Sequence, residues 1–122
     1  MKLMQKLFLT LGLLTAGATL AEAHAFLDHA EPRVGSTVTG SPSVVKIWFT
    51  EELEEAFSKI QVFDATGKEI DKKDVKVDSA DKSLMSVSVP NLPTGTYKVK
   101  WSAVAVDTHH TTGTYTFTVA SP

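Results

Sequence analysis

Three residues of this sequence have side chains that could bind a metal ion together: His24, Asp107 and His109. His24 directly follows Ala21-Glu22-Ala23, which has the small-x-small pattern that signal peptidase cleaves. Cleavage there would make His24 the first residue of the mature chain, so that its free α-amino group and its ring nitrogen could chelate one ion. An internal histidine has no free amine, and the expected cleavage site therefore bears directly on function.

The segment Asp107-Thr108-His109-His110 supplies the other donors. Residues i and i+2 of an extended chain point to the same side, so we expect an Asp107 oxygen and a His109 nitrogen to lie together, with His110 turned away. Taken alone, such a triplet is more often incidental than a ligand pair. With His24 it gives three nitrogens and one oxygen, a set that suits the tetragonal geometry of Cu(II). Spacing does not show that residue 24 meets residues 107–109, because that depends on the fold.

The first 23 residues have the three parts of a secretory signal peptide. Lys2 and Lys6 form a positive n-region, residues 7–20 an apolar region, and residues 21–23 the cleavage box. The apolar region is shorter than the roughly 20 residues that cross a bilayer as a helix. We therefore predict a signal peptide at 1–23, cleaved after Ala23, and one small exported domain at 24–122. The alternative is an uncleaved membrane anchor.

The composition narrows the class of function. The formal net charge is −2, and no basic cluster of the kind that binds nucleic acid is present. There is no cysteine, which excludes disulfides and thiolate metal ligands. The domain must therefore be held together by packed apolar strands, and any metal ion must accept nitrogen and oxygen ligands.

After residue 24, apolar residues mostly alternate with polar ones, between turn signals such as Gly40-Ser41-Pro42 and Asn91-Leu92-Pro93. No segment has a long helical period, and the acidic run 51–55 is expected to be a solvated loop or a single turn. The pattern predicts an all-β, two-sheet antiparallel sandwich. It has about seven short strands, at 25–30, 44–49, 59–64, 69–77, 83–89, 96–106 and 113–119.

Four stretches of the sequence resemble the CopC family of periplasmic copper-binding proteins. They are His24-Ala25-Phe26-Leu27-Asp28-His29-Ala30-Glu31-Pro32 with Gly35-Ser36, Ile47-Trp48-Phe49-Thr50-Glu51-Glu52-Leu53, Gly95-Thr96-Tyr97-Lys98-Val99-Lys100-Trp101-Ser102-Ala103-Val104, and Asp107-Thr108-His109 with Gly113. The resemblance covers nearly all of the chain after residue 23. Its joint signature is a histidine directly after the cleavage point and a D-x-H that follows a G-x-Y-x-V-x-W strand.

The resemblance implies an immunoglobulin-like Greek-key β-sandwich and a Cu(II) site made by the amine and imidazole of His24 with Asp107 and His109. An acidic residue that lies near this site in some members matches Glu51. That residue either orients a ligand or a water molecule, or is simply a solvated member of the acidic run. The resemblance also implies a periplasmic location, a role in copper resistance or homeostasis, and an inner-membrane copper-transport protein as partner.

The chain departs from part of the family at two points. Members with a separate Cu(I) site carry a methionine-rich loop with a histidine, because thioether sulfur suits Cu(I). Here the methionine after residue 23 is Met85, at a core position of a strand, so we expect no Cu(I) site. The second departure is His110, where proline is common. We expect His110 and His29 to be surface residues.

These residues predict a copper-binding protein and not an enzyme, with no catalytic residue and no polymer substrate. The alternative is a copper-dependent oxidase or monooxygenase, because lytic polysaccharide monooxygenases also bind copper with an N-terminal histidine and a second histidine. Asp107, as an anionic ligand, would favour Cu(II) and occupy an equatorial position, which speaks against that alternative. A third class is a plain interaction sandwich in which the histidines are incidental.

Overall fold

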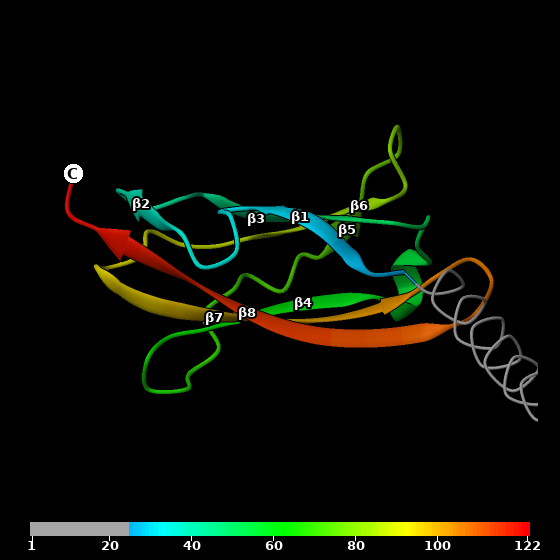
Figure 1. The fold of residues 1–122 in the computed structure, drawn as a ribbon. Helices are drawn as coiled ribbons and strands as arrows, with labels where there is room; N and C mark the ends of the chain where they lie inside the picture. Colours follow the sequence, from blue (N-terminus) through cyan, green and yellow to red (C-terminus); the bar gives the residue numbers. More distant parts are fainter. Residues whose placement is uncertain (1–24) are drawn as a thin grey trace, which may run out of the picture.

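The computed structural model describes residues 25–122, which form two four-stranded β-sheets packed face to face (Figure 1). In the first sheet the order is β1 (Leu27–Glu31), β3 (Val44–Phe49), β6 (Leu84–Ser88) and β5 (Lys76–Val77). In the second it is β2 (Thr37–Thr39), β8 (His110–Ala120), β7 (Gly95–Val104) and β4 (Lys59–Phe63). A 3-10 turn, η1 (Glu55–Phe57), precedes β4. The predicted all-β, immunoglobulin-like sandwich is confirmed.

The predicted signal peptide and His24 lie outside the described residues. Within residues 25–122, no helix is long and apolar enough to cross a membrane.

The core lies between the two sheets and follows from the period-2 pattern of the sequence. Alternate residues of β3, β7 and β8 point inward and are buried, whereas their neighbours are more exposed. Met85 is fully buried, as its strand position predicted. The largest fully buried side chains are Phe117, Ile47, Ile60, Met85, Val45, Val62, Val87 and Val99.

The structure differs from the prediction at three strands. The expected strand 69–77 is reduced to β5, because residues before it cap the edge of β4: Ile70 N–H donates to the Val62 carbonyl, and Val62 N–H donates to the Asp71 carboxylate, both at 2.8 Å. The short strand β2, which pairs in parallel with β8, was not predicted. The last strand begins at His110 and not at 113.

The β7–β8 hairpin is the longest pairing in the described part of the chain. It runs in register from Gly95 opposite Val119 to Val104 opposite His110. Near its closed end Gly113 lies opposite Trp101, whose ring packs edge-on against Phe49 at 5.1 Å between centroids. A Cβ at position 113 would lie 2.6 Å from Cε2 of that indole ring and 2.8 Å from Nε1. Only glycine fits there without displacing the ring.

We expect Gly113→Ala to lower the free energy of unfolding by about 1–3 kcal/mol, because the added methyl would collide with the buried ring of Trp101. Urea denaturation followed by tryptophan fluorescence would measure the change. The control is Thr114→Ala on the exposed side of the same strand. If both variants are equally stable, Trp101 yields more easily than this packing indicates.

Tyr115 carries a buried hydroxyl that has no hydrogen-bond partner among the described residues. Burial also raises the pKa of this phenol above its ordinary value of 10. A buried, unsatisfied hydroxyl is destabilising, so we expect Tyr115→Phe to raise the free energy of unfolding by about 1 kcal/mol. The matched control is Tyr97→Phe, which removes the 2.6 Å hydrogen bond to the Pro93 carbonyl and should lower stability by a similar amount. Thermal melts of the two variants should therefore shift in opposite directions.

Candidate metal centre

Residues 105–109 form a tight turn that closes the β7–β8 hairpin. The Ala105 N–H donates to the His109 carbonyl at 3.0 Å, and the Thr108 N–H donates to the Ala105 carbonyl at 2.8 Å. Thr108 has a φ of 76°, a left-handed conformation that few non-glycine residues adopt. The expectation that Asp107 and His109 share one side of an extended strand is therefore wrong. A turn brings them together.

Asp107 and His109 contact each other through their side chains. Oδ2 of Asp107 lies 3.2 Å from Nδ1 of His109, and Oδ1 accepts a 3.2 Å hydrogen bond from the His109 backbone N–H. Both side chains are about half exposed. When two donor atoms each lie about 2.0–2.1 Å from one metal ion and the donor–metal–donor angle is roughly a right angle, the two donors are about 3 Å apart. The pair thus has a spacing that suits neighbouring positions on one metal ion.

The chain just after His24 is fixed to both sheets. Ala25 is fully buried, and its carbonyl accepts a hydrogen bond from the Thr111 hydroxyl, near the start of β8. Phe26 exchanges two hydrogen bonds of 2.9 Å with Thr50, which directly follows β3. Sequence reasoning did not identify Thr50 or Thr111 as anchors. The run of threonines along the last strand gave no sign that one of them is special.

Glu51 lies in the exposed loop that follows Thr50. Within residues 25–122, no three histidine, aspartate, glutamate or cysteine side chains converge in a way that would hold a metal ion. Glu51 therefore does not complete a three-residue cluster with Asp107 and His109. Its role beside the site stays a prediction.

The remaining histidines lie on the surface, as predicted. His110 places Nε2 2.6 Å from the Ser102 hydroxyl of β7, and both residues are at the sheet surface. His29 stacks on Trp48 with 4.4 Å between ring centroids, and its Nδ1 is 2.7 Å from the Asp28 carboxylate. Sequence reasoning did not foresee this stacking, which comes from the β1–β3 register that places His29 opposite Trp48.

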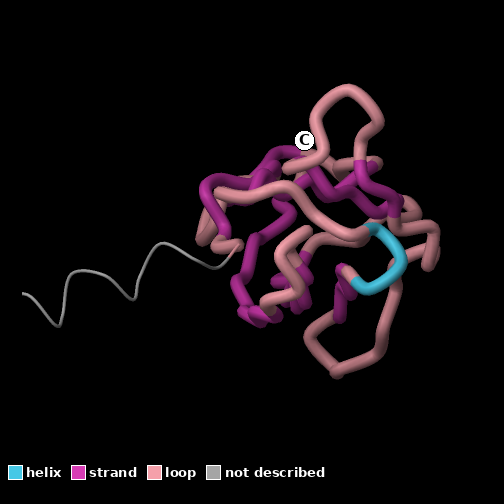
Figure 2. The backbone as a smooth tube through the Cα atoms, turned by 90° about the vertical axis from the view of Figure 1, so that its right-hand side faces the viewer, coloured by secondary structure: helices cyan, strands magenta, loops and turns pink. Residues whose placement is uncertain are grey.

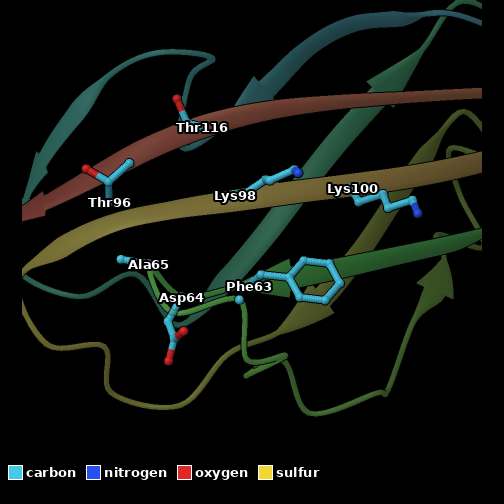
Figure 3. Close-up of a pocket in the computed structure, with 8 residues that line it drawn as sticks. Phe63, Asp64, Ala65, Thr96, Lys98, Lys100 and Thr116 are labelled. Atoms are coloured by element: carbon cyan, nitrogen blue, oxygen red, sulfur yellow. The ribbon is translucent and has the colours of Figure 1, made fainter.

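A shallow groove of about 560 Å³ lies on the outer face of the second sheet, away from Asp107 and His109. Figure 3 shows Lys98 and Lys100 along β7 above Phe63 of β4. None of the predicted metal ligands lines this groove. The groove is open and basic, and it does not contribute to the candidate metal centre.

The fold and the Asp107–His109 pair define a β-sandwich domain that presents nitrogen and oxygen donors at one end. The chain belongs to the CopC family, whose domain matches residues 27–120. The sequence is 34% identical over 126 residues to copper resistance protein C of Escherichia coli, covering 98% of this chain and 99% of that protein.

Two further proteins are similar to this chain. The crystal structure of CopC from Methylosinus trichosporium OB3b has a TM-score of 0.76 and 34% identity, with 80% of this chain and 95% of that chain covered. The copper transport protein CutJ of Bacillus subtilis (strain 168) is 31% identical over 98 residues, which are 80% of this chain. The matched region is only 18% of CutJ.

Proposed function

We propose that this protein binds Cu(II) in the periplasm and sequesters or delivers it in copper resistance or homeostasis. The ligands are the α-amine and imidazole of His24, exposed by cleavage after Ala23, together with Asp107 and His109. The observation that carries the proposal is the 3.2 Å Asp107–His109 pair at one end of a CopC-family sandwich. The names of two relatives, copper resistance protein C and copper transport protein CutJ, support copper as the ligand.

The position of Ala25 supports a ligand at residue 24. Consecutive Cα atoms are 3.8 Å apart, so the residue before Ala25 starts from a point that is tied to Thr111. Thr111 is the second residue of β8 and comes two residues after His109 in the chain. The tie between Ala25 and Thr111 therefore supports the proposal that a histidine before Ala25 is a ligand together with Asp107 and His109.

The donor set favours Cu(II) over the alternatives. Three nitrogens and one carboxylate oxygen suit tetragonal Cu(II), which also has the highest affinity in the first-row divalent order. Met85 is enclosed in the core and offers no thioether to Cu(I). Asp107 would hold the metal in its oxidised state, so we propose a binding protein and not an oxidase or monooxygenase. Glu51 is proposed to orient a ligand or a water molecule near the site.

CutJ supports the proposal of a membrane partner. The region of CutJ that resembles this chain makes up 18% of that copper transport protein. In CutJ, such a domain is therefore part of a much longer polypeptide. We propose that this chain exchanges copper with a separate inner-membrane copper-transport protein.

Extending the mature chain tests the proposed amine ligand. One alanine placed before His24 should weaken Cu(II) binding by at least about tenfold, because the histidine then loses its terminal amine. Intact mass spectrometry first establishes that the exported protein begins at His24 and takes up one copper, and competition with a chelator then gives the affinity. A chain with one alanine added after Pro122 is the matched control. If both extended chains bind copper equally, the amine is not a ligand.

Substitutions in the turn test the other two ligands. His109→Ala and Asp107→Ala should each weaken Cu(II) binding by at least about tenfold and change its electron paramagnetic resonance spectrum, because each removes a donor. His110→Ala should change neither, since that ring contacts Ser102. An effect of His110→Ala as large as that of His109→Ala would show that the ligand assignment is wrong.

A further inference from the structure

Large apolar side chains are exposed at the end of the sandwich that carries Asp107 and His109. Phe57 is 70% exposed and Val106 is 52% exposed. Phe57 ends η1, and Val106 directly precedes Asp107. Figure 1 shows η1, the start of β1 and the β7–β8 turn at one end of the molecule, and Figure 2 looks onto that end. Scattered apolar residues are ordinary on a protein surface, whereas a group beside a functional site indicates an interaction.

Phe57 is held outside the core by its neighbours. Leu53 is buried and forms a β-bridge with Ala105, and Ser58 is buried with its hydroxyl 3.0 Å from the Val104 N–H that donates to it. The Phe57 N–H donates to the Glu54 carbonyl at 3.2 Å. The backbone on both sides of Phe57 is thus fixed while its ring faces solvent. An aromatic ring on an ordered turn can bind a partner with little loss of conformational entropy.

Backbone hydrogen bonds join the loop before Phe57 to the turn that carries Val106. The Val106 N–H donates to the Glu52 carbonyl at 3.1 Å, and the Glu54 N–H donates to the Val104 carbonyl at 2.8 Å. The loop that leads to Phe57 therefore runs beside the turn that carries Val106 and Asp107. We call the surface made by Phe57, Val106, Glu51, Glu52 and Glu54 the copper-end face.

The charges on the copper-end face indicate the chemistry of its partner. Glu51, Glu52 and Glu54 are all exposed. A hollow of about 260 Å³ adjoins the face, with Leu53 and Val77 as apolar walls and Glu54, Glu55 and Asp78 as carboxylates. Two lysines oppose these charges: Lys82, which lines the hollow, and Lys59, which follows Ser58 in the chain. The carboxylates of the face and the hollow still outnumber these lysines. A lysine or arginine from a partner could lay its stem on the apolar walls and its charge against the carboxylates.

We propose, on the basis of the copper-binding function above, that the copper-end face is the docking surface for the protein that exchanges copper with this chain. That partner presents apolar side chains surrounded by lysine and arginine. Charge complementarity selects this occupant. An anionic membrane surface would be repelled by the glutamates, and the same face of a second copy carries the same charges. Docking here brings the partner next to Asp107 and His109, where copper can pass without release into bulk solvent.

The test is site-specific photocrosslinking in cells of the source organism grown with copper. The full chain carries p-benzoylphenylalanine in place of Phe57 or, as the control, in place of Val34, an exposed apolar residue in the β1–β2 turn. We expect a crosslink from position 57, and none from position 34, to a copper-transport protein with a basic exposed surface. That protein, once purified, should bind copper-loaded Phe57→Ser at least about tenfold more weakly than Val34→Ser. Added salt should weaken its binding to the wild type.

Several results would overturn the docking surface. They are no crosslink from position 57, the same crosslinks from both positions, a crosslink to a protein without a copper role, and equal binding of the two serine variants. A crosslink to a second copy of this chain would show instead that the copper-end face binds another face of that copy, such as the basic groove on its second sheet.

Copper uptake by intact mass spectrometry separates this docking surface from the proposed function. We expect Phe57→Ser to take up one Cu(II), as the wild type does. If it does so while partner binding is unchanged, only the docking surface fails. If the wild type takes up no copper, the proposed function itself fails.

Discussion

The pairing of β7 with β8 is the constraint on which the rest of the sandwich depends. Its register decides which residues face the core, and a slip of β7 by one residue would turn Val99 and Trp101 outward. The same register fixes where the hairpin closes, and hence where Asp107 and His109 lie. Thr111 belongs to this hairpin, and its hydroxyl donates to the Ala25 carbonyl. The register of the hairpin therefore also fixes Ala25 and the start of β1. Core packing and the geometry of the candidate site therefore depend on one alignment of two strands.

Period-2 alternation was sufficient to predict most of the fold, because most strands have one face in the core and one in solvent. Phe49, Met85 and Trp101 all lie where the pattern placed them. The alternation failed to predict the structure where a side chain, and not a neighbouring strand, forms the hydrogen bond to the backbone. The Asp71 carboxylate takes the Val62 N–H that a neighbouring strand would otherwise use, so the predicted strand 69–77 shrinks to β5. The strand β2 is too short and too polar for its alternation to be recognised.

The sequence was enough to propose residues for the candidate site but not to predict the geometry of the Asp107–His109 pair. Asp107 and His109 were identified from their types and spacing, yet the extended conformation assumed for them is replaced by a turn with Thr108 in the left-handed region. Spacing cannot report such a turn, because it depends on hydrogen bonds between Ala105 and residues 108 and 109. The exposure of Phe57 was equally inaccessible, since it follows from Leu53 and Ser58 occupying the inward positions.

The packed core of the described chain lies between the sheets, whereas Asp107 and His109 lie at their rim, half exposed. Many small metalloproteins fold only when the ion binds, so that losing the ion means losing the structure. Here apolar side chains hold the sandwich together, and the proposed ligands Asp107 and His109 belong to a turn closed by its own hydrogen bonds. Metal binding by these proposed ligands would therefore be largely uncoupled from folding. Such a domain can be loaded and unloaded repeatedly while its empty form stays native, which is what a reusable carrier needs and a permanently metallated protein does not.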